Sequence, residues 1–177
     1  MSELLVADIG GTGSRLGFMI DGILVGEAVS YTNADYHSFD AILADFLRQE
    51  QKIPAKAALA VAGPVHNQSV QMTNLGWSFS AVKLSAATGI AAVEIINDFA
   101  ALAWSTLSLE AGDLFQVGGG SPRPDANRAI IGPGTGLGVS GLIHGDNGWS
   151  AMAGEGGHVT LSATTHAEAE LIAGVSR

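Results

Sequence analysis

Two glycine-rich segments with the same pattern constrain the fold of this chain more than any other feature of its sequence. Residues 10–22 read "GGTGSRLGFMIDG" and residues 133–145 read "PGTGLGVSGLIHG". In each case, apolar runs typical of β-strands precede and follow a Gly-Thr-Gly turn. We therefore predict two strand–turn–strand units, one in each of two related domains that face each other. Two unrelated glycine-rich turns are the alternative interpretation.

The apolar periodicity along the whole chain predicts strands and helices in alternation. Strands are expected at residues 4–9, 14–20, 23–31, 57–62, 65–72, 91–96, 128–131, 137–144 and 149–152, and helices at 39–47, 80–88, 98–107 and 166–175. Ser38 is a candidate N-cap of the first helix, and Asp21-Gly22 is a candidate hairpin turn. We expect a domain boundary near Leu107–Gly112, which divides the chain into residues 1–109, a small α/β domain, and residues 110–177, the start of a larger one.

The charge and the cysteine content exclude several classes of function. The chain has 17 acidic and only 8 basic residues, a formal net charge of −9. Nucleic acids and anionic membranes bind basic surfaces, so neither is an expected partner. The absence of cysteine excludes disulfides, thiolate catalysis and cysteine-ligated zinc. Because no segment looks like a signal peptide or a membrane span, we expect a soluble cytoplasmic protein.

The glycine-rich turns are candidates for phosphate binding, because such turns expose consecutive backbone N–H groups to an anion. The dinucleotide fingerprint does not fit, since Leu16 and Val139 stand where its third glycine is required. A Walker A loop does not fit either, because the chain has no Gly-Lys-Ser/Thr. A phosphate site here would depend on backbone amides, Thr hydroxyls and a metal ion. Asp8, at the end of the first expected strand, is the carboxylate that could bind Mg²⁺, and a simple turn former is the alternative.

Asp98 is a carboxylate within an otherwise largely apolar stretch, "EIINDFAALAWS" at residues 94–105. An acidic side chain that enters a core costs free energy unless it is paired, hydrogen-bonded or used in chemistry. Two roles are open. Asp98 could be the N-cap of the helix that begins here, where a negative charge is favoured, or it could be a general base. The two roles do not exclude each other, and we favour the base.

Five motifs in order resemble those of the bacterial-type glucokinases, in the hexokinase branch of the actin-like ATPase superfamily. They are "ADIGGTGSRLG", "MTNLGWSFS", "EIINDFAALA", "GPGTGLGV" and "GEGGHV", and the resemblance runs over essentially the whole chain. It implies an α/β, actin-like ATPase (ribonuclease H-like) fold with a mixed sheet. It also implies ATP-dependent phosphorylation of glucose to glucose 6-phosphate. A kinase of another hexose, or a non-catalytic sensor of sugar or nucleotide, is the alternative.

The resemblance also implies a role for each residue that matches a motif of the family. Asp98 matches the catalytic base, which takes the proton of the sugar's 6-hydroxyl. The residues implied in sugar binding are Asn97, Asp98, Glu155 and His158. Those implied in nucleotide binding are Ala7, Asp8, Ile9, Gly10, Gly11, Thr12, Gly134, Thr135 and Gly136. Asp8 is further implied as the Mg²⁺ ligand, through water, so that the expected cofactors are ATP and Mg²⁺. A metal site at Glu155 and His158 is disfavoured, because the surrounding glycines oppose a helix.

The length of the chain differs from that of the resembled family, whose members are nearly twice as long. We therefore expect a fragment with a complete first domain and a second domain that is only begun. Such a chain should expose an apolar patch and associate with a second copy as a homodimer. It should carry most of the sugar-binding residues. By itself, it should show no ATP-dependent phosphorylation of sugar.

Overall fold

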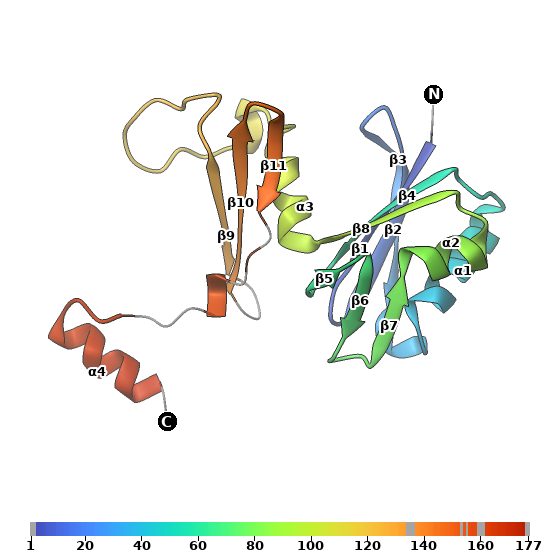
Figure 1. The fold of residues 1–177 in the computed structure, drawn as a ribbon, viewed down its shortest axis with the longest axis horizontal. Coiled ribbons are helices and arrows are strands. Elements are labelled where there is room, and N and C mark those ends of the chain that lie inside the picture. Colours follow the sequence, from blue (N-terminus) through green and yellow to red (C-terminus); the bar gives the residue numbers. More distant parts are fainter. Residues whose placement is uncertain (1–2, 134–136, 153, 155, 159–161, 176–177) are drawn as a thin grey trace.

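The computed structural model describes residues 3–133, 137–152, 154, 156–158 and 162–175 (Figure 1). The strands are β1 Glu3–Ile9, β2 Gly13–Ile20, β3 Ile23–Thr32, β4 Lys56–Val61, β5 Val65–His66, β6 Ser69–Met72, β7 Trp77–Ser80, β8 Ala92–Asn97, β9 Arg128–Pro133, β10 Leu137–Gly145 and β11 Gly148–Met152. The α-helices are α1 Phe39–Glu50, α2 Ala81–Thr88, α3 Asp98–Ser105 and α4 His166–Val175, with short 3-10 helices η1 Asn33–Asp35, η2 Ala111–Asp113 and η3 Gly156–His158. Apart from residues 65–80, these elements confirm those predicted from the periodicity.

Five strands form a mixed sheet in the order β3-β2-β1-β4-β8. Strands β1, β4 and β8 are parallel to one another, whereas β2 and β3 run antiparallel to their neighbours. The β2–β3 hairpin turns at Asp21 and Gly22, whose φ angles of 52° and 84° confirm the predicted two-residue turn. Because three strands are parallel, their carboxyl ends lie along one edge of the sheet, and the candidate site lies at this edge.

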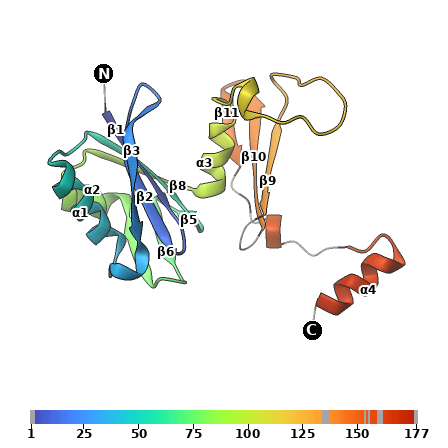
Figure 2. The ribbon, with the colours of Figure 1, turned by 180° about the vertical axis from the view of Figure 1, so that it is seen from behind.

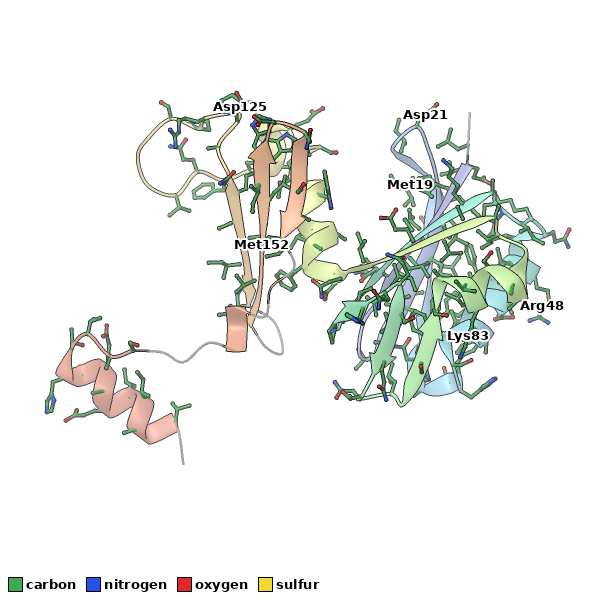
Figure 3. All side chains as sticks on the ribbon, in the orientation of Figure 1. Met19, Asp21, Arg48, Lys83, Asp125 and Met152 are labelled. Atoms are coloured by element: carbon green, nitrogen blue, oxygen red, sulfur yellow. The ribbon has the colours of Figure 1, made fainter. Side chains whose placement is uncertain are left out.

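Helices α1 and α2 lie together on one side of this sheet (Figures 1 and 2). Ser38 is the predicted N-cap of α1, and its hydroxyl accepts a hydrogen bond from the N–H of Ala41 at 3.3 Å. The buried face of α1 consists of Phe39, Ile42, Leu43, Phe46 and Leu47. The ring centroids of Phe39 and of Phe79 in β7 are 5.0 Å apart. Side chains fill the space between the sheet and the helices (Figure 3). This part of the chain therefore has a continuous apolar core of its own.

The single strand predicted at residues 65–72 is wrong, because the segment is a hairpin. Its two strands, β5 and β6, are joined by Asn67 and Gln68, which have φ angles of 48° and 56°. Strand β7, which the periodicity did not indicate, completes a three-stranded antiparallel sheet with them. Four consecutive polar residues, His66 to Ser69, interrupt the alternation of apolar and polar residues at the turn. Gln is a residue type that rarely adopts positive φ, so Asn67 is the only usual turn residue among the two that form the turn.

A second small sheet, in the order β11-β10-β9, packs against α3. Ala103 of α3 lies in one apolar cluster with Ile130 and Leu142, and Phe99 and Trp149 pack at the margin of this cluster. Both views place α3 between the five-stranded sheet and this smaller sheet (Figures 1 and 2). The two sheets have separate clusters of buried residues, and the domain division at residues 109 and 110 stays a prediction.

Several large apolar side chains beyond α3 are exposed to solvent. Phe115 and Val117 in the loop before β9 are 90% and 88% exposed, and Leu171 and Val175 of α4 are 69% and 85% exposed. Helix α4 contributes no buried residue.

Among the helices in the described ranges, none combines the length and the apolar character that crossing a membrane requires.

Candidate active site

The carboxyl ends of β1, β4 and β8 bring together three segments that are far apart in the sequence. Ile9 pairs with Val61, and Val61 pairs with Asn97, so the residues that follow these strands share one edge of the sheet. The glycine-rich loop at residues 10–13 follows β1, Gly63 lies just beyond β4, and Asp98 follows β8. Ligand sites of open α/β sheets lie at this position relative to the strands. The structure thus places the first predicted phosphate loop beside the predicted base.

The loop at residues 10–13 has the geometry of an anion site. The N–H of Gly10 donates to the carbonyl of Gly13 at 2.9 Å, which closes the loop on itself. Gly11 and Thr12 are exposed at its tip. Their backbone N–H groups donate to no acceptor within the described residues. Exposed N–H groups in a tight turn are the donors that a phosphate requires.

Asp8 precedes this loop and forms an ion pair. Its Oδ2 lies 2.5 Å from Nη2 of Arg15, and both side chains are about half exposed or more, at 49% and 67%. The described ranges contain no group of three or more His, Asp or Glu residues that could hold a metal ion. Mg²⁺ commonly binds proteins through one or two carboxylates and keeps several waters. Asp8 therefore fits Mg²⁺ only as a single, partly hydrated contact, and its role as a metal ligand stays a prediction.

Asn97 is the N-cap of α3, and the alternative in which Asp98 is only the cap is wrong. The Oδ1 of Asn97 accepts hydrogen bonds from the N–H groups of Phe99 and Ala100, at 3.0 and 3.2 Å. Its Nδ2 donates to the carbonyl of Gly63 at 3.1 Å, which joins the end of β8 to the loop after β4. Asp98 is the first helical residue, and its Oδ1 accepts a second hydrogen bond from Phe99 at 2.8 Å. The capping role of Asn97 leaves Asp98 available for chemistry.

The surroundings of Asp98 favour its neutral form. Burial raises the pKa of the Asp98 carboxyl above its ordinary value, the Phe99 N–H lowers it by less, and the negative charge of Asp8 raises it. No Lys or Arg within the described part of the chain forms an ion pair with Asp98. A carboxyl with a raised pKa is suited to general-base catalysis, because proton transfer is most efficient when the pKa lies near the working pH, and the role of Asp98 as a base stays a prediction.

The pKa of Asp98 predicts how stability depends on pH. Because the folded chain holds this carboxyl above the ordinary value of 3.8, ionisation favours the unfolded state. The contribution of Asp98 is thus fully present below pH 3.8 and is lost as the pH rises through the folded-state pKa. We expect Asp98→Asn to be more stable than the unchanged chain at pH 7, and this difference to shrink as the pH falls toward 3.8. Urea unfolding of both chains across this range measures it, and a difference independent of pH would contradict the assignment.

The cap at Asn97 predicts a loss of stability that is separate from catalysis. Asn97→Ala removes two hydrogen bonds to the first turn of α3 and the bond to Gly63. We expect the free energy of unfolding to fall by about 1–2 kcal/mol, as for other N-caps. Asn97→Ser keeps a capping oxygen and should recover part of this loss. Equal urea midpoints for Asn97→Ala and the unchanged chain would show that the cap contributes nothing.

Phe99, the residue after Asp98, is a contact that the sequence analysis missed. Its ring lies directly against two glycines, Gly132 of β9 and Gly138 of β10, which flank the second glycine-rich turn. A Cβ atom added at Gly132 would lie 2.8 Å from Cε1 and Cζ of Phe99, and one at Gly138 would overlap the ring. A close approach of a ring to a backbone is a physical reason for glycine at both positions. The pairing fixes the helix that carries Asp98 against the hairpin of the second turn.

The remaining predicted site residues lie wholly or partly beyond what the structure describes. Gly134, Thr135, Gly136 and Glu155 lie outside the described residues. His158 is the last residue of η3. The same 3-10 helix lies against β10, since a Cβ at Gly156 would be 3.0 Å from Cβ of Val139. The structure therefore brings Asp8, the first loop, Asn97 and Asp98 together, and the roles of all the predicted site residues stay predictions.

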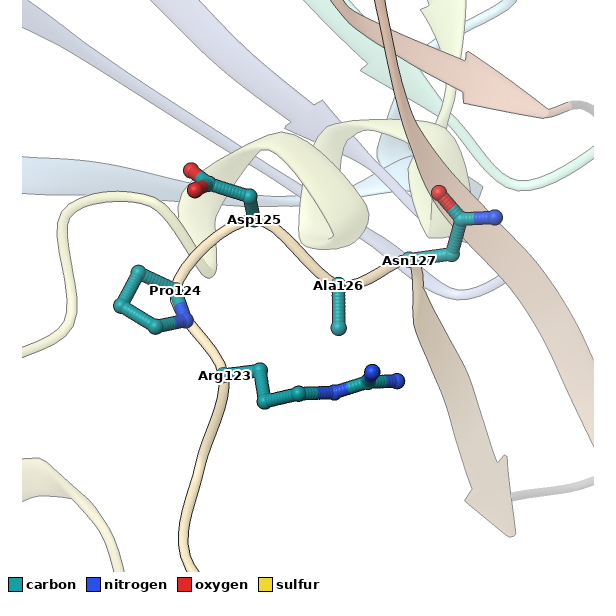
Figure 4. Close-up of a pocket in the computed structure, with 5 residues that line it drawn as sticks. All are labelled: Arg123, Pro124, Asp125, Ala126 and Asn127. Atoms are coloured by element: carbon teal, nitrogen blue, oxygen red, sulfur yellow. The ribbon is translucent and has the colours of Figure 1, made fainter.

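Of two hollows in the surface, one lies away from this arrangement and the other includes Asp8. One, of about 540 Å³, is lined by Arg123, Pro124, Asp125, Ala126 and Asn127 (Figure 4). It belongs to the loop before β9, whereas the second glycine-rich turn follows the other end of that strand. The other, of about 290 Å³, lies over β1, β2 and β3 and has Asp8 and Arg15 at its margin. Neither contains Asp98 among its lining residues.

Comparisons with known proteins identify one family. The family model described as glucokinase matches residues 5–177. The glucokinase of Aromatoleum aromaticum is 43% identical over 172 residues, which cover 96% of this chain and 52% of that protein. The glucokinase of Chromobacterium violaceum is 40% identical over 165 residues, which cover 93% of this chain and 47% of that protein. The chain thus spans about half the length of the curated relatives it matches.

A solved structure gives the same result for the fold. The crystal structure of a glucokinase from an Antarctic psychrotroph is 33% identical, with a TM-score of 0.85 over 98% of this chain and 56% of that chain. This likeness confirms the predicted α/β, actin-like ATPase fold with a mixed sheet. It also confirms the resemblance from which the site residues were inferred. The chain belongs to the glucokinase family.

Proposed function

We propose that this chain contributes the catalytic base and the first phosphate loop to the ATP-dependent phosphorylation of glucose. The observation that carries the proposal is the position of Asp98. Its half-buried carboxyl, with a raised pKa, lies at the carboxyl end of β8 beside the loop at residues 10–13. Glucokinase is the name of the relatives that match over nearly the whole chain, and phosphorylation of glucose is the reaction that this name denotes.

In the proposed reaction, Asp98 acts as the general base. Its carboxylate accepts the proton of the 6-hydroxyl of glucose while the hydroxyl oxygen bonds to the γ-phosphorus of ATP. The bond from this phosphorus to the β–γ bridging oxygen breaks, and ADP leaves with the electron pair. The proton stays on Asp98 until solvent removes it after glucose 6-phosphate departs. The raised pKa makes the carboxylate a stronger base than a free aspartate.

The first loop and Asp8 are proposed to bind the phosphates of ATP. The exposed N–H groups of Gly11 and Thr12 can donate to phosphate oxygens without a lysine. Asp8 would hold Mg²⁺ through water, and the ion would supply neutralisation of phosphate charge. Residues 134–136 are proposed as the second phosphate loop, since Phe99 packs against glycines on both sides of them.

Sugar binding is proposed for Asn97, Asp98, Glu155 and His158. Asn97 uses its oxygen for the cap and one Nδ2 hydrogen for Gly63, so its other amide hydrogen can donate to a sugar hydroxyl. We expect Glu155→Gln and His158→Ala to raise the Kd for glucose by about tenfold or more each, the usual cost of a lost polar contact to a ligand. Calorimetric titration with glucose measures this, and unchanged affinity in both variants would make the segment a structural turn.

The proposed function is tested by a coupled assay of phosphorylation against a panel of sugars. Glucose 6-phosphate formation is expected from the active protein that carries this sequence. Faster turnover of another hexose would favour the first alternative, and glucose or ATP binding without turnover would favour a sensor. Because the 177-residue chain spans about half of its relatives, the assay includes this chain by itself, for which we expect no turnover.

Two further properties belong to the same proposal. We propose a homodimer, because exposed apolar side chains such as Phe115 and Val117 favour association. Light scattering of the purified chain tests this, and a monomer at all concentrations would refute it. The cytoplasm is the proposed location, since a chain without cysteine fits a reducing compartment.

A further inference from the structure

Asn33 and Ser14 form a buried polar contact to which no role has been assigned so far. Each side chain is 1% exposed. Besides Ser140, they are the only buried Ser, Thr, Asn, Gln or charged residues in the part of the chain that the structure describes. Asn33 begins η1, just after β3, and Ser14 lies in β2 directly after the first phosphate loop. Burying an amide and a hydroxyl is costly unless both are hydrogen-bonded, so their partners explain why they are retained.

The hydrogen bonds of Asn33 converge on the phosphate loop. The Oδ1 of Asn33 accepts from the hydroxyl of Ser14 at 2.8 Å. Its Nδ2 donates to the carbonyl of Gly10 at 2.9 Å, and its backbone N–H donates to the carbonyl of Thr12 at 3.0 Å. Ser14 thus fixes the orientation of the amide, and the amide in turn holds a loop carbonyl. One residue binds the loop at two points, across 23 positions of sequence.

This arrangement decides which way the loop presents its amide groups. The carbonyl of Gly10 and the N–H of Gly11 belong to one peptide unit, and the described chain contains no cis peptide bond. In a trans peptide the carbonyl and the N–H point in opposite directions. Because Asn33 holds the carbonyl of Gly10 toward the interior, the N–H of Gly11 must face outward. That N–H donates to no acceptor among the described residues.

We propose that Asn33, oriented by Ser14, is a positioning residue that fixes the Gly10–Gly11 peptide so that the Gly11 N–H binds a phosphate of the nucleotide. The inference rests on the proposed function for the identity of the anion. The orientation of the peptide itself rests on the hydrogen bonds alone. Without Asn33, the peptide could rotate and turn a carbonyl oxygen, which repels phosphate, toward the site.

Two variants that disturb the Asn33 hydrogen bonds to different degrees test the proposal. Asn33→Asp removes the donor to Gly10 and places a carboxylate against that carbonyl. Ser14→Ala is milder, because it removes only the hydroxyl that orients the amide. Ser85→Ala is the matched control, since it deletes a hydroxyl that donates to a backbone carbonyl, that of Ile90 at 2.7 Å, in the α2 region. All three variants are made in the 177-residue chain, and urea unfolding first establishes how much stability each loses.

The first measurement is hydrogen exchange at the Gly10 N–H, which the closed loop protects through its bond to Gly13. We expect exchange at this site to accelerate by at least about tenfold more in Ser14→Ala and Asn33→Asp than in the control, which corresponds to about 1.4 kcal/mol of lost protection. Protection equal to that of Ser85→Ala in both variants overturns the proposal. Should Asn33→Asp fail to fold, Ser14→Ala decides the matter.

The second measurement separates positioning from simple destabilisation. The Kd for ATP with Mg²⁺ is expected to rise by about tenfold in Asn33→Asp, while the Kd for glucose stays unchanged. An equal loss of both affinities shows a general structural role and overturns the proposal. A chain that binds no ATP before any substitution counts against the proposed nucleotide site. In that case, hydrogen exchange at Gly10 still decides whether Asn33 holds the loop.

Discussion

Asp98→Asn is expected to lower kcat for glucose phosphorylation by about 10²–10⁴-fold, the usual range for loss of a general base. The carboxamide keeps the shape of the side chain, and its oxygen can still accept the hydrogen bond from Phe99. It cannot take up the proton of the sugar hydroxyl. Because the change leaves the cap at Asn97 intact, helix α3 should begin at the same residue. We expect the Kd for glucose to change by less than about threefold, so the loss falls on turnover rather than on binding.

The control for this prediction is Asp40→Asn, which alters an aspartate in the first turn of α1. This helix packs against the five-stranded sheet. Its kcat should equal that of the unchanged protein. The measurement is a coupled assay at saturating glucose and ATP, with the active protein that carries this sequence. Near-normal turnover by Asp98→Asn would remove Asp98 from the chemistry. A parallel collapse of glucose affinity would instead show that Asp98 acts mainly in sugar binding.

The same assay across pH tests the environment of Asp98. Because burial and the charge of Asp8 raise its pKa, activity should fall on the acidic side at a pH above 3.8. Asp8→Asn removes one of the two causes, so the acidic limb should move to lower pH in that variant. An acidic limb at the same pH in both proteins would show that the charge of Asp8 does not reach Asp98.

Gly138→Ala is expected to cause the largest loss of stability of any single methyl group added to the smaller sheet. The new Cβ would overlap the Phe99 ring, which also contacts Gly132. Overpacking of a well-filled site typically costs about 1–3 kcal/mol, and here the ring must leave its place to relieve the overlap. A displaced Phe99 would move α3, and with it Asp98. We therefore expect both a lower free energy of unfolding and a lower kcat.

Two further variants make this prediction specific. Gly145→Ala lies on the same strand, where an added Cβ meets no atom within 4 Å, and it should leave stability nearly unchanged. Phe99→Leu costs stability by itself, but Gly138→Ala should cost much less in its presence, because the ring is gone. Urea unfolding of the unchanged chain, Phe99→Leu, Gly138→Ala and the double variant gives the coupling energy between the two positions. We expect this energy to exceed about 1 kcal/mol. Additive effects would mean that the ring and the glycine do not constrain each other.

The sequence by itself determined the positions of most strands and helices of this protein. The alternation of buried residues in β1 and β4, and the helical spacing of the apolar residues in α1, follow from the side-chain geometry of a strand and a helix. Local cues such as Ser38 and Asp21-Gly22 were sufficient for a cap and a turn. The prediction of one strand failed between Val65 and Met72, where four consecutive polar residues, His66 to Ser69, include a hairpin turn with an unusual Gln. Ordered motifs, rather than periodicity, led to the glucokinase family.

Only the tertiary structure decided how these elements form a site. Asn97 and Asp98 are adjacent polar residues with equal claims to the cap, and the bond from Asn97 to Gly63 on another loop separates their roles. The pKa of Asp98 depends on burial and on Asp8, which is distant in sequence. Likewise, nothing in the sequence pairs Phe99 with Gly138, or Asn33 with Gly10. These contacts join positions that parallel strands and packed hairpins bring together, and local patterns of residues carry no information about such distances.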